Sequence, residues 1–177
     1  MTGQVYLLAD QEISGAIAFG SRQQLFTPEL VMNQQLNRTA ITIHEIYRRS
    51  TGNTAPAWEE LSEFLRQSNI AAADHLLTKI RLLLEDDRIS AVTPEICGKA
   101  YSAYRKMLPE QQEHFRKIEH LRWTRFHVLH NWRYAPLRDN SRREHPLLRP
   151  FDALPPAEQA KDDFAWEMLD TLAREPG

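Results

Sequence analysis

Cysteine and glycine are scarce in this chain of 177 residues, which has one cysteine, Cys97, and six glycines. A single cysteine excludes an internal disulfide framework and a zinc site built from several cysteines. No apolar run approaches the roughly 20 residues that a membrane-spanning helix needs. The apolar segment Val5–Leu8 is followed at once by acidic residues and has no basic segment before it, unlike a secretory signal peptide. We therefore expect a cytoplasmic chain, either free or tethered to a membrane through a module of a longer parent protein.

The overall charge is also low, and its distribution is uneven. The formal net charge of -2 argues against a protein that coats long nucleic acid. Residues 116–149, however, hold nine basic and three acidic residues, a net charge of +6, whereas residues 150–177 hold two basic and seven acidic residues, a net charge of -5. Eight of the nine basic residues are arginines, whose forked guanidinium groups suit phosphates and carboxylates. The basic segment is therefore compatible with one small phosphorylated ligand.

Helical periodicity dominates the middle of the chain and predicts an all-α domain over residues 27–177. Thr27 and Thr93 each precede a proline and a glutamate, the typical start of a helix. Residues 131–154 combine prolines with apolar bulk, which favours a long but ordered loop. Residues 1–26 are expected to be an irregular leader or the remnant of an upstream module. The expected helices span residues 28–49, 57–67, 69–86, 94–107, 109–130 and 156–173.

The two halves of the chain show a weak internal similarity. The matching positions pair His44 with His120, Tyr47 with Trp123, and Trp58 with Phe151. We interpret them as two tandem, pseudo-symmetric helix-loop-helix repeats, over about 38–86 and 110–174, with the long loop inserted in the second. Neither unit can bury an apolar face alone, so we expect them to pack on each other about a pseudo-twofold axis. Chance similarity between amphipathic helices is the alternative.

Four motifs follow one another in the second half, namely Glu119-His120-Leu121-Arg122-Trp123, Asn131-Trp132-Arg133-Tyr134-Ala135, Arg138-Asp139 and the run from His145 to Leu154. In this order they resemble the ryanodine-receptor (RyR) repeat domain, in its bacterial tandem or stand-alone form. The runs Ile43–Tyr47 and Arg66–Asn69 are similar to the degenerate partner repeat of bacterial members. Asn131 and Ala135 stand where the family has glycines.

The resemblance implies a domain without catalytic activity, because in animal channels this module is peripheral and regulatory. Bacterial relatives occur beside nucleotide-related sensor or effector modules, including anti-phage signalling systems. We therefore expect a small anionic ligand, such as a nucleotide or cyclic nucleotide, with arginines on phosphate, aromatic rings against the base, and Asn69 and histidines setting specificity. The residues expected to line the site are His44, Tyr47, Ser68, Asn69, His75, His120, Trp123, Trp132, Arg133, Tyr134, Arg138, Asp139, Arg143 and His145.

Other interpretations of these residues remain open. Trp123 suits a helix core, several arginines suit ion pairs with the acidic last helix, and Asn69 suits the N-cap of a helix beginning at residue 70. His44 and His120 suit hydrogen bonds to nearby backbone or acids. The competing function is a protein–protein interaction or oligomerisation module, homo-oligomers included, because arginine and tryptophan are typical of interface hot spots.

Metal and catalytic chemistry have weak support in the sequence. His127 and His130 lie one helical turn apart and His145 can approach from the loop, but no carboxylate stands at the spacing of a known metal motif. Cys97 has no histidine beside it, and there is no glycine-rich phosphate loop. We expect neither a cofactor nor an enzyme.

Overall fold

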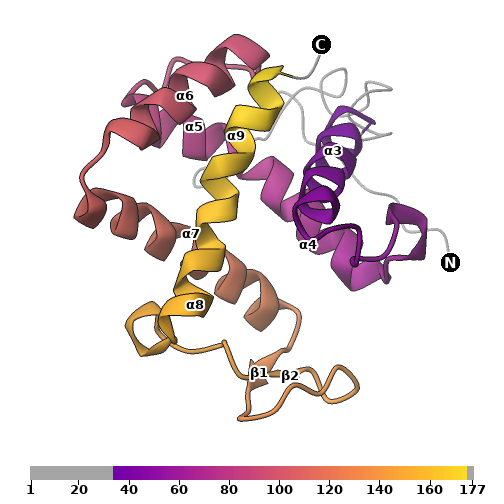
Figure 1. The fold of residues 1–177 in the computed structure, drawn as a ribbon. Coiled ribbons are helices and arrows are strands. Elements are labelled where there is room, and N and C mark those ends of the chain that lie inside the picture. Colours follow the sequence, from indigo (N-terminus) through magenta and orange to yellow (C-terminus); the bar gives the residue numbers. More distant parts are fainter. Residues whose placement is uncertain (1–33, 175–177) are drawn as a thin grey trace, which may run out of the picture.

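The computed structural model describes residues 34–174, and within them nearly all regular structure is helical (Figure 1). This confirms the predicted all-α class. The leader, its short apolar segments and the expected helix start near Thr27 lie outside the described residues. The helices and strands are α3 (Gln34–Ser50), η1 (Trp58–Glu60), α4 (Glu63–Asp74), α5 (Leu76–Leu84), α6 (Pro94–Lys106), α7 (Pro109–Leu129), β1 (Arg133–Tyr134), β2 (Glu144–His145), η2 (Phe151–Ala153), α8 (Pro156–Gln159), η3 (Ala160–Asp163) and α9 (Phe164–Arg174).

Local hydrogen bonds explain where several helices begin. The hydroxyl of Thr93 accepts a hydrogen bond from the backbone N–H of Ile96 at 3.3 Å and caps α6, as the sequence predicts. α7 starts without a hydroxyl cap, and the side chain of Gln111 instead accepts from the N–H of Leu108 at 2.9 Å. Each cap satisfies a backbone donor that the first helical turn leaves free.

The predicted division between helices 57–67 and 69–86 is wrong. The hydroxyl of Ser62 accepts from the N–H of Leu65 at 3.4 Å, so α4 starts at Glu63 and continues through Ser68. Asn69 caps no helix, because its side-chain amide donates to the carbonyl of Leu65 in the same helix at 2.9 Å. The break falls at His75, the single residue between α4 and α5.

The predicted helix 156–173 is also interrupted. Its first part folds as α8 and the 3₁₀ segment η3, and only α9 is a continuous α-helix. The predicted helices at 94–107 and 109–130 match α6 and α7 within one residue at each end. The two strands lie inside the predicted loop 131–154 and pair in parallel, with Arg133 opposite Glu144 and Tyr134 opposite His145.

The hydrophobic core forms where α9 packs against α6 and α3 (Figure 1). Trp166 of α9 is fully buried at its centre, with its ring stacked on Tyr104 of α6 at a centroid distance of 5.8 Å. Leu76 and Ile80 of α5 close the core from another side, and both are fully buried. The β1–β2 segment lies at the opposite end of the molecule from α6 (Figure 1).

Among the described residues, no helix combines the length and apolar character needed to cross a bilayer. The division into two tandem repeats stays a prediction.

Candidate functional site

The segment 131–149 is an ordered loop, which we call the arginine loop. It begins at Asn131, whose left-handed backbone (φ 63°) ends α7 and lets the N–H of Trp132 bond to the carbonyl of His127 at 3.0 Å. Asparagine adopts this conformation more readily than most residues, so it suits this position. Asp139 and Glu144 then exchange two backbone hydrogen bonds, of 3.0 and 2.8 Å, and close the loop.

Asp139 stabilises the turn at the tip of this loop. Its Oδ1 atom accepts hydrogen bonds from the N–H and the hydroxyl of Ser141 and from the N–H of Arg142, at 2.6 to 3.1 Å. The Ser141 hydroxyl, followed by the backbone N–H groups, lowers the pKa of this carboxyl. Asp139 therefore serves the loop's own shape.

A cluster of aromatic rings anchors the loop to the helices. Trp132 is only 8% exposed and stacks on Phe64 of α4 at 5.0 Å. Trp123 of α7 lies 4.0 Å from the ring of His127 and 5.1 Å from that of His145. Trp132, expected to line the ligand site, therefore stacks on a protein ring and leaves little of its own ring exposed.

The histidines of this cluster are uncharged at neutral pH. Burial, above all other causes, lowers the pKa of both His127 and His145 to about 4. The Nδ1 atom of His127 donates to the carbonyl of Trp123 at 2.9 Å, and that of His145 accepts from the N–H of Leu147 at 3.2 Å. Neither ring adds positive charge for an anion. Among the residues that the structure describes, no three His, Cys, Asp or Glu side chains gather to hold a metal ion.

The arginines point outward from this anchored base. Arg133 and Arg142 have side chains that are 65% and 64% exposed, and they share one carboxylate oxygen of Glu144, at 2.7 and 3.3 Å. Arg138 donates to the side chain of Asn140 at 2.9 Å, and Arg143 donates to the carbonyl of His130 at 3.1 Å. Tyr134, 53% exposed, lies on the same loop.

His44 and His120 make matching contacts in the two halves. The Nε2 atom of His44 donates to the carbonyl of Pro56 at 2.9 Å, and that of His120 donates to the carbonyl of Arg149 at 2.8 Å. Each carbonyl belongs to the residue two before an aromatic ring, Trp58 or Phe151, and each histidine ring lies 5.9 Å from that aromatic ring. Both histidines are buried. Their interpretation as backbone-bonded helix histidines thus fits the geometry.

The first-half residues of the predicted site do not reach the arginine loop as a group. Ser68 lies inside α4 and not at a helix start, which corrects the expected Ser68–His75 helix start. Tyr47 is 44% exposed and contacts Phe164 of α9 edge-on at 5.4 Å. His75 lies near Glu119 and Arg122 of α7, and burial lowers its pKa.

The structure also reveals a buried charge cluster that the sequence analysis did not single out. Lys79 of α5 is fully buried, and its Nζ atom lies 2.7 Å from the carboxylate of Glu119, which Arg122 also binds at 2.7 Å. Burial raises the pKa of Glu119, but the two cations outweigh it and hold the pKa at about 2. Asp162 lies 3.6 Å from His120, and burial with the nearby Glu119 raises its pKa to about 7. The sequence feature that could have indicated this cluster is a lysine within the apolar pattern of α5.

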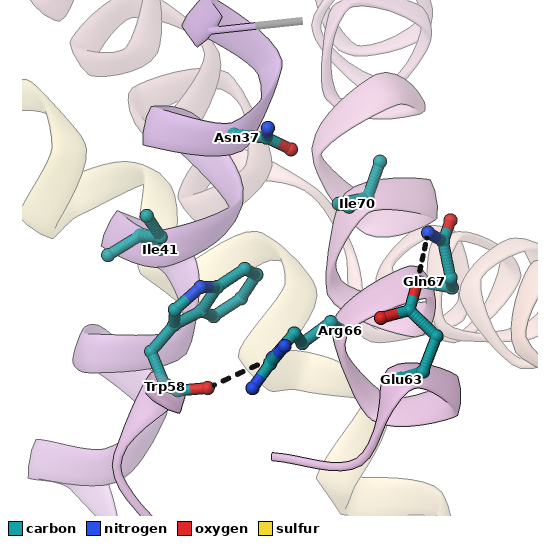
Figure 2. A pocket seen from close by; sticks show the side chains of 7 residues that line it. All are labelled: Asn37, Ile41, Trp58, Glu63, Arg66, Gln67 and Ile70. Carbon is teal, nitrogen blue, oxygen red and sulfur yellow. Dashed lines mark hydrogen bonds between the residues drawn. The ribbon is translucent and has the colours of Figure 1, made fainter. Parts of the chain in front are cut away.

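One open groove lies between α3 and α4, with a volume of about 410 Å³ (Figure 2). The indole of Trp58 lies between the two helices, with Ile41 on the α3 side and Ile70 on the α4 side (Figure 2). We call it the Trp58 groove, and it is lined by Asn37, Ile41, Trp58, Glu63, Arg66, Gln67 and Ile70.

Comparison with known families identifies the second half of the chain. Residues 104–174 match the family model described as the RyR domain. This segment is an RyR domain. No curated protein and no solved structure matches the chain. The RyR domain runs from Tyr104 of α6 to the last residue of α9 and therefore contains the arginine loop, the His120 contact and most of the buried charge cluster.

Proposed function

We propose that the chain is a non-catalytic ligand-sensing domain whose arginine loop binds a small anionic, nucleotide-derived signal such as a cyclic nucleotide. In this proposal, binding regulates an effector joined to the domain or associated with it, as in bacterial anti-phage signalling. The observation that carries the proposal is the set of exposed guanidinium groups on one ordered loop.

The charge balance of the loop favours an anion. Residues 133–144 contain four arginines against two carboxylates, Asp139 and Glu144, a net charge of +2. Asp139 is engaged in the turn, and Glu144 is shared by two arginines at 2.7 and 3.3 Å. Exposed guanidinium groups with little counter-charge are suited to forked hydrogen bonds with phosphate.

In this proposal the buried rings hold the loop in place and do not contact the ligand. Because Trp132 and His145 are packed beneath the loop, the arginines are presented from a fixed backbone. Ligand binding then costs less conformational entropy than ordering a mobile loop would. Tyr134 is the exposed aromatic side chain on which a base can stack.

A thermal-shift screen with linear and cyclic nucleotides tests the proposal. A ligand at a concentration of about 100 times its Kd adds about 2.7 kcal/mol to the free energy of unfolding, which raises Tm by about 5–10 °C. Arg138→Ala and Arg142→Ala should each reduce this shift, whereas Arg105→Ala removes an exposed charge from α6 and should leave it unchanged. The proposal fails if no nucleotide at millimolar concentration shifts Tm, or if Arg105→Ala reduces the shift as much as the loop variants do.

Exposed apolar side chains near the loop favour the second candidate, a protein–protein interaction module. Leu129 at the end of α7 is 80% exposed, and Leu137 on the loop is 79% exposed. Large apolar side chains beside arginines are typical of interface centres. Light scattering across a wide range of protein concentrations would show self-association that Leu129→Ser and Leu137→Ser weaken, without any nucleotide-dependent shift in Tm.

A further inference from the structure

The second half of the chain carries a cation over an aromatic ring beside its histidine contact. The Nζ atom of Lys117 lies 5.8 Å from the centroid of the Phe151 ring. Two carboxylates hold the ammonium group there, Glu113 at 2.9 Å and Asp152 at 2.8 Å. An ammonium ion over an aromatic face is attracted by the negative face of the ring.

The Trp58 groove lies at the matching place in the first half. Lys117 stands three residues before His120, and Ile41 stands three residues before His44. The two places share a further contact. Arg66 donates to the carbonyl of Trp58 at 3.3 Å, and Gln159 donates to the carbonyl of Phe151 at 3.1 Å. Each donor is the eighth residue after its aromatic ring, although Arg66 lies within α4 and Gln159 ends the short helix α8.

The two halves differ mainly in the side chain that the preceding helix places beside each aromatic ring. In the second half the Lys117 side chain brings an ammonium group, whereas the first half has the uncharged Ile41 at the same helix position. The indole of Trp58 and the side chain of Ile41 line the groove together (Figure 2). Tryptophan is also the aromatic residue that attracts cations most strongly.

Two charged side chains line the groove, the carboxylate of Glu63 and the guanidinium of Arg66. Glu59 and Glu60 lie outside the lining, in η1 next to it, and residues 59–66 carry a net charge of -2. The guanidinium of Arg66 donates to the carbonyls of Trp58 and Glu59, at 3.3 and 2.7 Å. Glu63 lines the groove, and Gln67 donates to one of its carboxylate oxygens at 2.8 Å (Figure 2). Among the side chains that line the groove, Gln67 alone donates a hydrogen bond to the carboxylate of Glu63.

We propose that the Trp58 groove binds a small organic ammonium ion, with its charge over the indole ring of Trp58 and the carboxylate of Glu63 as its counter-charge. The volume of about 410 Å³ is that of a small-molecule site. The groove lies on α3, η1 and α4, outside residues 104–174, and it is separate from the arginine loop. Its ligand has the opposite charge to the one proposed for that loop.

An NMR titration of the full chain with n-butylammonium chloride tests the proposal, with the indole N–H of Trp58 as the reporter. 1-Butanol is the uncharged analogue, and sodium chloride controls for ionic strength. The amine should give a saturable shift of the Trp58 signal that 1-butanol does not reproduce. Glu63→Gln should weaken amine binding by about two- to fivefold, because Glu63 is exposed and its ion pair is partly screened. Equal binding of 1-butanol, or no effect of Glu63→Gln, would overturn the proposal.

A reciprocal pair of variants tests the correspondence between the two halves. Ile41→Lys places an ammonium group on the chain at the position that Lys117 occupies in the other half, so it should abolish the amine-induced shift, whereas Ile41→Met should retain it. Ile41 is 36% exposed, so neither substitution disturbs the core. Lys117→Met should create a second amine site, reported by the Phe151 ring signals. Amine binding that persists in Ile41→Lys contradicts the proposal.

Discussion

Replacing Glu119 by glutamine removes the one carboxylate that two buried cations share. Lys79 has no exposed surface, and the side chains of Glu119 and Arg122 are 10% and 12% exposed. Glutamine keeps the size of the side chain and removes its charge. In Glu119→Gln, the ammonium of Lys79 and the guanidinium of Arg122 therefore face each other without the carboxylate.

The expected cost is large because a buried charge loses its partner. Breaking one member of a buried ion pair costs about 3–5 kcal/mol, which lowers Tm by about 6–20 °C for a chain of this size. Lys79→Met should cost less, since Arg122 still binds Glu119 in that variant at 2.7 Å. The order of destabilisation, Glu119→Gln above Lys79→Met, follows from which charge is left unpaired.

Urea unfolding at pH 7 measures these differences, with Glu95→Gln as the control. Glu95 pairs with Lys99 on the surface of α6, where both side chains are more than half exposed, so its loss should cost about 0.5 kcal/mol or less. The pKa of Glu119 is about 2 in the folded state and 4.5 without the fold, so its contribution is complete above pH 4.5 and is lost as the pH falls toward 2. A cost below about 1 kcal/mol, or a larger cost for Lys79→Met, would refute the reasoning.

Three further predictions follow from buried groups. The pKa of Asp162 is raised to about 7 in the folded state, so the stability that this carboxyl contributes is complete below pH 3.8 and is lost as the pH rises through 7. Asp162→Asn should therefore stabilise the protein at pH 8. This advantage, measured by urea unfolding, should shrink toward pH 4. Trp132→Ala should cost about 3–5 kcal/mol by removing the ring that stacks on Phe64, and a loss of less than about 1 kcal/mol would contradict the anchoring role. Cys97 is 1% exposed, and burial raises its pKa to about 11, so a thiol reagent should modify it only after unfolding; rapid labelling of the folded protein would contradict this burial.

Local signals in the sequence predicted the helices well where a cap or a proline marks the start. Thr93 before Pro94 placed α6 correctly, and Pro109 placed α7. The boundary near Ser68 was wrong because polar residues in the middle of a helix resemble a loop in a single sequence. Asn69 satisfies its side chain within α4, which no periodicity argument reveals.

The sequence predicted which loop carries the arginines, but not which side chains of that loop are buried. The arginine loop and its order were expected from prolines combined with apolar residues. The side chains of this loop differ in burial, however. Trp132 and His145 form the base, whereas Arg133 and Tyr134 remain on the surface. This division depends on contacts with Phe64 of α4, far away in the sequence, and such contacts leave no local pattern.

Lys79 is a second case in which the sequence does not reveal the contact partner of a residue. Its position in an apolar stretch of α5 gave a signal, but its partner Glu119 lies on α7, forty residues later. The pairing depends on how the helices pack, and a sequence pattern does not specify that.

NMR mapping of a nucleotide titration is the most direct test of the proposed function. Backbone and arginine side-chain signals of the full chain are followed as cyclic and linear nucleotides are added. We predict saturable shifts confined to residues 131–149, with the guanidinium signals of Arg138 and Arg142 among the largest. The absence of shifts at millimolar ligand, or shifts centred on residues outside this loop, would contradict the account.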